Sequence, residues 1–545
     1  MPAWTARWFI GYLPGMFLGL FAIACQDPDP ASADADHDGV ADREDCADHD
    51  AAVHPGAADA WYDGVDADCA GNDDFDADED GARLEVDCDD ADPTRAPGLE
   101  ETWYDGIDAD CAGDSDWDAD GDAFTVPGAP DGDPTDCDDA DPGLSPGIEL
   151  NTDLSPTGVP SQPVASPGAL WVGSAMLRVS NLTFVAQHHA TVAAGEDGRF
   201  AVTWQWGRTY DRPYPLVRIV EDDAILGLPV SASPLGIGGI KPDIESQPGS
   251  YVVVFEETQT DLWLARFDLD GNPVGEPVKL TASAGLVEAP DLALFTDGTG
   301  VVAYTAVGGA AGEGTHRVQR FGVDLSPVGE PVDLQAGGRT VVDVVARPDG
   351  GWVAVATRQL VLQDRFEIYG RLVRGDGCVV NFRADQGESQ APSRPTLAIG
   401  PDGGFVATWR AKVAIAEGEG VYGRFFDDIG RARSDSFQLS GTDLDANRPV
   451  VSIWDDLAMF AWEGESDGGP LPAPLDVRTQ TWSISQRLPV TAVQRLNEPG
   501  STVSAERPAI GIAPRGDGTA TAMVTWEQVG ADTRVSTVPV TLVAP

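Results

Sequence analysis

The sequence predicts an all-β protein, in which a seven-bladed β-propeller follows a small, irregular, aspartate-rich repeat region stabilised by disulfides and metal ions. Two observations lead to this fold class. Seven apolar, strand-like segments recur from residue 200 onward at a spacing near 51, with one spacing of about 65. Ahead of them, between residues 34 and 113, one unit occurs twice at a spacing of 42. The two copies share carboxylates, cysteines and turn residues but almost no apolar residues, so they cannot fold around a hydrophobic core.

Each apolar segment is the centre of a larger unit. A short strand precedes it, in several units with an Asp-Gly turn between the two, and a third and a fourth strand follow. Four strands in 40 to 50 residues are typical of a propeller blade. The seven segments begin at Phe200, Tyr251, Val301, Trp352, Phe405, Leu457 and Ala522.

The two ends of the expected propeller complement each other. The last unit ends soon after its third strand, whereas Met176-Leu-Arg-Val-Ser180 has the pattern of a fourth strand and lies ahead of the first unit. We therefore expect this N-terminal strand to complete the seventh blade. A ring closed in this way has no open sheet edge that could pair with another chain.

The acidic region has an unusual charge balance. The whole chain has a formal charge of −56, and residues 26–150 contain 42 Asp and Glu against 3 Arg and no Lys. Such a surface excludes nucleic acid as a partner, because binding a polyanion requires Lys and Arg. The same charge density would keep the region disordered unless cations offset it.

Asp34-x-Asp36-x-Asp38-Gly39 and Asp76-x-Asp78-x-Asp80-Gly81 have the pattern of a calcium loop, with oxygen ligands at positions 1, 3 and 5 and a glycine for the sharp turn. Asp116-x-Asp118-x-Asp120-Gly121 opens a third, truncated copy. A solvated acidic linker is the alternative. The expected ligands are Asp34, Asp36, Asp38, Asp42 and Asp45 in the first copy, Asp76, Asp78, Asp80 and Asp87 in the second, and Asp116, Asp118 and Asp120 in the third.

Four cysteines follow the same repeat. Cys46 and Cys69 lie 23 residues apart, and so do Cys88 and Cys111, which favours one disulfide within each copy, although four cysteines allow three pairings. Two further cysteines, Cys137 and Cys378, either form a bridge or stay reduced.

The residues Asp87-Cys88-Asp89-Asp90-Ala91-Asp92-Pro93, Pro97-Gly98 and Asp105-Gly106-Ile107-Asp108-Ala109-Asp110-Cys111 resemble the metal-binding repeat named after the copper-binding surface protein MopE of methanotrophs. The family name implies copper, and in such proteins a modified tryptophan contributes to copper binding, which makes Trp61 and Trp103 candidates. The ligand types favour Ca²⁺, because copper prefers imidazole and sulfur ligands. Copper or another transition metal remains the alternative cofactor.

The N-terminus indicates export. Arg7, an apolar stretch from Trp8 to Ala24, and Ala22-Ile23-Ala24 before Cys25 resemble the signal peptide and cleavage box of a bacterial lipoprotein, with Cys25 lipidated. Ordinary cleavage after the same Ala-Ile-Ala and an uncleaved membrane helix are the alternatives. We expect a signal peptide at 1–25, metal-binding repeats at 26–150, a Pro-rich linker at 151–168 and the propeller at 169–545. The whole resembles an exported lipoprotein of the myxobacterial type, placed on the outer membrane or cell surface or else secreted.

The propeller sequence shows no nucleophile elbow, no phosphate-binding loop and no sialidase-type Asp box. His188 and His189 begin an expected inner strand, where they either face the central channel or simply end the strand.

We therefore expect a non-enzymatic, Ca²⁺-binding surface lipoprotein, with no catalytic residues. Its propeller would present a recognition or adhesion surface to an extracellular protein or glycan, and a lipid anchor would be its only attachment to the membrane. A metal-scavenging protein and a propeller hydrolase or lyase are the alternatives. The hydrolase or lyase would require a polar, titratable cluster at the channel mouth.

Overall fold

The structure is a computed structural model. It describes residues 33–126, 129, 136–141, 149–150, 176–180, 187–207, 213–221, 224–233, 237–257, 260–281, 286–308, 314–337, 341–360, 365–386, 390–412, 418–441, 445–465, 474–497, 503–530 and 533–543. The expected signal peptide, the lipidation site Cys25 and the Pro-rich linker lie outside these residues. The chain divides into two compact units, Met1–Trp117 and Asp118–Pro545, so the third acidic copy belongs to the same unit as the propeller.

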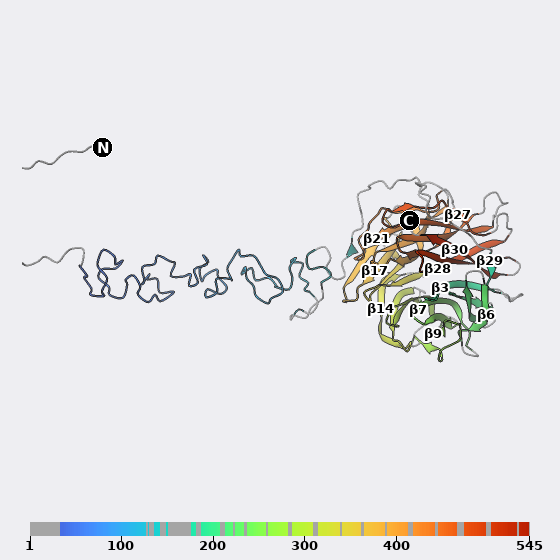
Figure 1. Cartoon of the computed structure of the whole chain (residues 1–545), viewed down its shortest axis with the longest axis horizontal. Helices are drawn as coiled ribbons and strands as arrows, with labels where there is room; N and C mark the ends of the chain where they lie inside the picture. Colours follow the sequence, from blue (N-terminus) through green and yellow to red (C-terminus); the bar gives the residue numbers. More distant parts are fainter. Residues whose placement is uncertain are drawn as a thin grey trace, which may run out of the picture. The chain divides into compact units, whose positions relative to one another are not determined.

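The first unit, from residue 33 to Trp117, is a succession of turns without helix or strand (Figure 1). Its buried apolar side chains are limited to Ala82 and Ala96 within this described stretch. Aspartate side chains instead accept many backbone N–H groups, for example Asp63 Oδ1 from Val65 and Asp105 Oδ1 from Ile107, both at 2.9 Å. The expectation of a region without a hydrophobic core is confirmed.

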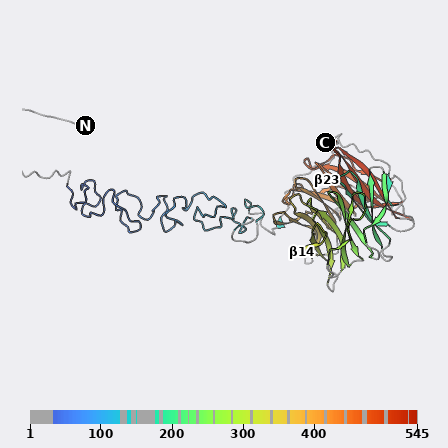
Figure 2. The ribbon, with the colours of Figure 1, turned by 60° about the horizontal axis from the view of Figure 1, so that its bottom comes forward.

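The second unit contains seven sheets arranged as a propeller, which Figures 1 and 2 show from two sides. The strands of the first three blades are β3 (Gln187–Ala194), β4 (Phe200–Trp206), β5 (Tyr214–Glu221) and β6 (Ala224–Ser231), then β7 (Ile240–Gln247), β8 (Ser250–Glu257), β9 (Asp261–Asp268) and β10 (Val278–Lys279), then β11 (Leu286–Leu294), β12 (Gly300–Val307), β13 (Gly314–Phe321) and β14 (Pro327–Gly337).

The next three blades repeat this order, and two of them carry an additional strand. Their strands are β15 (Val342–Ala346), β16 (Trp352–Leu360), β17 (Arg365–Val373) and β18 (Val379–Arg383), with β1 (Glu149–Leu150) added in parallel to β18, then β19 (Gln390–Ile399), β20 (Phe405–Lys412), β21 (Glu419–Phe426) and β22 (Phe437–Gln438), then β23 (Asn447–Trp454), β24 (Leu457–Glu465), β25 (Leu475–Ser483), β26 (Leu488–Pro489) and β27 (Gln494–Arg495).

The seventh blade closes the ring as the sequence predicts. It consists of β28 (Ser504–Pro514), β29 (Thr519–Val529), β30 (Arg534–Val543) and the N-terminal strand β2 (Leu177–Arg178). β2 pairs with β30 in antiparallel fashion, and the Val179 N–H donates to the Val535 carbonyl at 3.0 Å. The innermost strands β3 and β28 lie side by side in Figure 1, so the first and last blades meet.

The closing strand should matter for stability. Val179 is fully buried, whereas its neighbour Arg178 is exposed. We expect Val179→Asp to lower the free energy of unfolding by about 3 kcal/mol or more, because it buries a carboxylate among apolar side chains. Arg178→Asp is the matched control and should have little effect. Urea denaturation would measure both, and equal midpoints for the two variants would contradict this closure of the ring.

The blades pack through apolar side chains, and equivalent positions in different blades hold the same residue type. Trp204, Trp409, Trp462 and Trp526 occupy the same place in the second strands of four blades, and each is at most 1% exposed. The period of about 51 residues in the sequence therefore reflects a repeated packing position. Among the described residues there is no helix, and so none long and apolar enough to cross a membrane.

Carboxylates also link neighbouring blades. Asp243, Asp291 and Asp343 each lie on an inner strand and accept, through Oδ2, a backbone N–H of the inner strand in the next blade, from Leu292 at 3.0 Å, Val344 at 2.7 Å and Leu397 at 2.7 Å. Buried glutamates on second strands do the same. Glu463 accepts the N–H of Arg507 at 2.6 Å, and Glu527 accepts that of His189 at 2.5 Å. These hydrogen bonds satisfy backbone N–H groups of the innermost strands, which are edge strands of their sheets.

Candidate functional site

The first two acidic loops bring their aspartates together. In the first loop, Asp34, Asp36 and Asp38 have carboxylate oxygens within 4.8 Å of one another. The turn depends on Gly39, whose φ is 102°, and its N–H donates to Asp34 Oδ2 at 3.1 Å. Asp76, Asp78 and Asp80 repeat this arrangement around Gly81, whose φ is 100°. Both glycines adopt the left-handed conformation for which the loop pattern requires glycine.

One oxygen of each central aspartate is held by the loop itself. Asp38 Oδ1 accepts the N–H of Val40 at 2.7 Å, and Asp80 Oδ1 accepts that of Ala82 at 2.8 Å. The other oxygen, Oδ2, is buried and has no hydrogen-bond donor among the residues that the structure describes. This holds at positions 3 and 5 of each of three loops, for Asp36, Asp38, Asp78, Asp80, Asp120 and Asp122. Buried carboxylate oxygens require a positive partner, and a hard cation between them would supply it.

The electrostatics of the loops point the same way. Burial raises the pKa of Asp36, and the charges of Asp38, Asp45 and Asp34 add to this effect. Burial likewise raises the pKa of Asp78, reinforced by neighbouring carboxylates of its own loop. A divalent cation would reverse this, because it stabilises the ionised form of every carboxylate around it.

The third loop begins two residues later than the local Asp-Gly pattern indicates. Its first position is Asp118, whose Oδ2 accepts the N–H of Ala123 at 2.9 Å, as Asp34 accepts that of Gly39. Ala123 has a φ of 73° and takes the place of the loop glycine. Gly121, with a φ of 75°, stands at position 4, where the other loops have His37 and Glu79 in the same left-handed conformation.

The ligand candidates of the third loop shift accordingly. Asp118 and Asp120 stay in the loop, and Asp122 joins them, although the local pattern did not include it. Burial raises the pKa of Asp136 to about 6, with smaller contributions from Asp122 and Asp120, so Asp136 lies near this loop. The 42-residue spacing, continued from Asp76, Asp78 and Asp80, leads to Asp118, Asp120 and Asp122.

Asp116 has a different role. Its carboxylate accepts the N–H groups of Tyr104 at 3.0 Å and Gly106 at 2.7 Å. Asp74, one repeat earlier, accepts that of Gly64 at 2.6 Å. The structure therefore places Asp116 in a turn-stabilising position and not at position 1 of a loop.

The remaining candidates at the loop ends differ from one another. Asp42 Oδ1 accepts the N–H of Ala35 at 2.8 Å, so the loop backbone occupies this oxygen. Asp45 and Asp87 close their loops beside cysteine sulfurs. These sulfurs belong to disulfides and are not thiolates, which makes them poor metal ligands. The assignments of individual ligands stay predictions.

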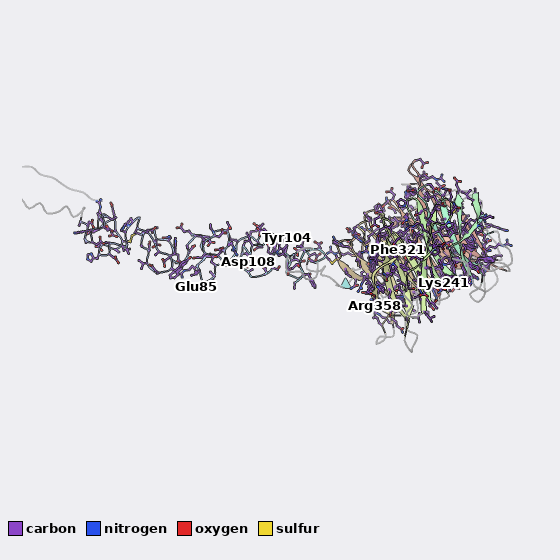
Figure 3. All side chains as sticks on the ribbon, turned by 90° about the horizontal axis from the view of Figure 1, so that it is seen from below. Glu85, Tyr104, Asp108, Lys241, Phe321 and Arg358 are labelled. Atoms are coloured by element: carbon purple, nitrogen blue, oxygen red, sulfur yellow. A yellow bond between two sulfur atoms is a disulfide. The ribbon has the colours of Figure 1, made fainter. Side chains whose placement is uncertain are left out.

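The sequence pattern did not predict a further acidic cluster, which lies between the second and third loops. Glu101, Asp108 and Asp110 have carboxylate oxygens within 4.8 Å of one another, and Asp108, labelled in Figure 3, has a buried Oδ1 without a donor in the described chain. Asp108 Oδ2 accepts the N–H of Gly113 at 3.1 Å, the same contact across five residues that begins each calcium-type loop. This repeated Asp-to-Gly spacing is the signal that could have identified the cluster.

All six cysteines in the described residues form disulfides. Cys46–Cys69 and Cys88–Cys111 confirm the expected pairing within each copy. Cys137 pairs with Cys378, 241 residues away, which decides between the two alternatives left open by the sequence. Since the third copy lacks a second cysteine, the propeller supplies it from the turn before β18. Arg374 Nη1 donates to the Cys137 carbonyl at 2.7 Å and strengthens this attachment.

A second candidate site is the central channel of the propeller, a cavity of about 760 Å³ lined by the inner strands. His189 lines it, which answers one question raised by the sequence, but burial lowers the pKa of this histidine to about 3, so it is neutral. The channel also contains cations that sequence reasoning missed, namely Lys241, Arg394, Arg410, Arg448 and Arg507. Lys241 is labelled in Figure 3. All of these cations except Arg410 precede a proline and lie at a bulge of an inner strand. The recurring Lys-Pro and Arg-Pro pairs could have identified these residues in the sequence.

Acidic side chains line the same channel. Burial raises the pKa of Asp243 to about 6, that of Asp343 to about 8 and that of Glu245 to about 8, and it raises the pKa of Asp291 well above its usual range. The three aspartates belong to consecutive blades. The charges of Asp343 and Asp243 raise the pKa of Asp291, and that of Asp243 also raises the pKa of Asp343. Asp291, Asp343 and Glu245 therefore stay largely protonated near neutral pH, whereas Asp243 is largely ionised there.

These raised pKa values predict that stability depends on pH. Asp343 is neutral in the folded protein up to about pH 8, whereas the unfolded chain ionises near its ordinary value of 3.8. Its contribution to stability is complete below the unfolded pKa and is lost as the pH rises through the folded pKa. Asp343→Asn keeps an acceptor for the Leu397 N–H. It should be about 1–2 kcal/mol more stable than the parent at pH 8, a figure reduced from the full shift because the Asp343 residue is only partly buried. Thermal unfolding at pH 8 and pH 4 tests this, and an equal difference at both pH values would contradict it.

Comparison with known protein families identifies the acidic repeats. Residues 45–74, 87–116 and 136–149 match the family profile Cu-binding MopE, described as "Putative metal-binding motif". No curated protein is significantly similar to the chain.

Similar solved structures include a protein of unknown function from Dyadobacter fermentans (10% identity, 69% of this chain and 100% of that one, TM-score 0.43). Another is a subtype N11 neuraminidase-like protein of the flat-faced bat strain H18N11 (7% identity, 73% and 98%, TM-score 0.41). A third is the polysaccharide lyase Uly1 (8% identity, 66% and 90%, TM-score 0.38). None of these similarities bears on the activity of this chain.

Proposed function

We propose that the protein is a non-enzymatic, calcium-binding lipoprotein of the cell surface. In this proposal the acidic region at residues 33–117, which we call the arm, becomes rigid when it binds Ca²⁺. The propeller serves recognition or adhesion. The observation that carries the proposal is the buried, donor-free Oδ2 atom at positions 3 and 5 of all three loops. One calcium ion in each of the three loops would neutralise many of the carboxylates that otherwise repel one another. Export and a lipid anchor on Cys25 belong to the proposal and rest on the N-terminal sequence.

Calcium suits these loops better than copper does. The donors are carboxylate oxygens, which hard cations prefer. The cysteines of the described arm are oxidised, and each of its histidines, His37, His49 and His54, has Nδ1 within hydrogen-bonding distance of a backbone carbonyl. Copper or another transition metal as cargo is the alternative that the family name suggests.

Isothermal titration of the full mature chain tests the choice of metal. We expect three calcium ions per chain, one for each loop, and no displacement by Cu²⁺ in a buffered competition. A preference for copper over calcium would replace this proposal with metal scavenging. Mass spectrometry of the protein from membranes would test the anchor, since lipidation adds a diacylglyceryl group to Cys25.

One observation favours a propeller hydrolase or lyase as a second candidate. The channel holds the polar, titratable cluster that such an enzyme requires, with Asp243, Asp343 and Glu245 as groups of raised pKa. The two aspartates also have an architectural role, because each accepts a backbone N–H from the next blade. We therefore propose that the channel binds a ligand without cleaving it. Incubation with acidic polysaccharides and analysis of chain length tests this, and shortened products that depend on Asp243 or Asp343 would establish the enzyme instead.

A further inference from the structure

The inner strands place a row of cations at the channel. In four blades the inner strand carries a cation directly before a proline. These cations are Lys241, Arg394, Arg448 and Arg507. All four have a φ between 45° and 53°, in the left-handed region, and the pairing with the second strand shifts register beside each of them. Residues with side chains seldom adopt this conformation. Its recurrence in four blades aims the four side chains at one cavity, whose lining includes all of them.

Most of these cations have a carboxylate partner. Lys241 Nζ lies 3.0 Å from Glu256, Arg448 Nη1 lies 2.6 Å from Glu463, and Arg507 Nη1 lies 3.0 Å from Glu527. Arg410, from the second strand β20, pairs with Glu419. In contrast, Arg394 has no ion pair or hydrogen bond within the described part of the chain.

Arg394 is also in an environment that disfavours its charge. Its side chain is partly buried, and this burial is the main cause that lowers its pKa. The charges of Arg448 and Arg410 lower the pKa further, Glu463 opposes them, and Arg507 adds a smaller lowering effect. A guanidinium that is partly desolvated, surrounded by like charges and unpaired is destabilising unless an anion joins it. A single uncompensated cation matches a ligand with a single negative charge.

The chemistry around Arg394 narrows the class of ligand. A guanidinium presents parallel N–H donors that fit a planar carboxylate. Asp243, Asp291 and Asp343 line the same channel and offer carboxyl groups that can accept from hydroxyl groups and, when protonated, donate to them. A cavity of about 760 Å³ lies in the usual range for small-molecule sites.

We propose that the channel binds a sugar acid, a saccharide that carries one carboxylate, with the carboxylate on Arg394 and the hydroxyl groups on the inner-strand carboxyls of blades two to four. This deepens the proposed function, because it names the class of ligand that the recognition surface takes. Arg410, Arg448 and Arg507 are paired with glutamates, so Arg394 is the cation left to receive the carboxylate.

Calorimetry on the full mature chain in millimolar Ca²⁺ tests the proposal, with D-galacturonate, D-glucuronate and N-acetylneuraminate as probes, and galactose and inorganic phosphate as comparators. At least one sugar acid should bind at least about 10-fold more tightly than galactose and phosphate. Arg394→Gln should reduce that affinity at least about 10-fold while the midpoint of urea unfolding stays the same or rises, because an unpaired charge has been removed. Arg320→Gln, at an exposed position of β13, is the matched control and should bind as the parent does.

Three results would overturn the proposal: no sugar acid binds better than galactose, phosphate binds as well as the sugar acids, or Arg394→Gln binds like the parent. A calcium titration of the same preparation keeps the two proposals separate. Bound calcium without sugar-acid binding would refute the channel ligand alone, whereas sugar-acid binding without calcium uptake would refute the calcium arm alone.

Discussion

Replacing Asp78 and Asp80 together by asparagine is expected to abolish calcium binding at the second loop. The asparagine Oδ1 can still accept the backbone N–H that Asp80 Oδ1 accepts from Ala82 at 2.8 Å. The donor-free Oδ2 becomes an amide NH₂ group, so the loop loses two charges and two oxygen ligands at once. We expect the affinity of this loop to fall at least about 100-fold, which corresponds to about 2.7 kcal/mol. Calorimetry should then count two strong sites per chain where the parent has three.

The control removes the same charge elsewhere in the arm. Asp63 and Asp105 are exposed and stabilise turns through Val65 and Ile107. The double variant Asp63→Asn with Asp105→Asn should retain three sites, because these carboxylates lie outside the loops. If both double variants lost affinity equally, general charge would explain binding, and the loop geometry would be irrelevant.

Removing the Cys137–Cys378 bridge is expected to have the largest effect on the stability of the propeller. The bridge joins residues 241 positions apart and closes a loop that contains the first three blades and most of the fourth. Chain entropy alone gives up to about 5 kcal/mol for a loop of this length, and measured values are usually smaller. We expect Cys137→Ser with Cys378→Ser to lower the free energy of unfolding by about 3–5 kcal/mol, as measured by urea denaturation with tryptophan fluorescence.

The repeat itself provides the comparison for this bridge. Cys88–Cys111 spans 23 residues within the arm, so the double variant Cys88→Ser with Cys111→Ser should leave the unfolding of the propeller unchanged. It should increase proteolysis of the arm instead. If the propeller of the Cys137 and Cys378 variant unfolded at the urea concentration of the parent, the bridge would have no role in holding the blades.

The sequence predicted the blades because each repeats one packing position, such as that of Trp204 and Trp526, at a regular spacing. It predicted Cys46–Cys69 and Cys88–Cys111 because the same separation occurs twice. In both cases a repeated unit carries the information, since two copies under the same physical constraint keep the same spacing.

Two features of the acidic region needed the structure. The third loop was placed two residues early, because the local Asp120-Gly121 pair outweighed the longer period that leads to Asp122 and Ala123. The partner of Cys137 depends on how the third copy attaches to the propeller, through Arg374 and β1. Neither contact leaves a local pattern in the sequence.

The channel cations were missed for a different reason. A residue before proline usually adopts an extended conformation, which gives no reason to expect Arg394 or Arg448 at a left-handed bulge. Only the assembled ring shows that these bulges turn side chains from several blades toward one cavity. The position of these cations around one cavity therefore depends on the tertiary fold.

The central claim is that divalent cations order an arm that has no hydrophobic core. Limited proteolysis of the intact mature chain under oxidising conditions, in millimolar Ca²⁺ and in excess EGTA, tests this claim most directly. We predict rapid cleavage between residues 33 and 117 in EGTA, protection of the same stretch in calcium, and an intact propeller in both. Identical cleavage of the arm in the two conditions, with its disulfides formed, would contradict the claim.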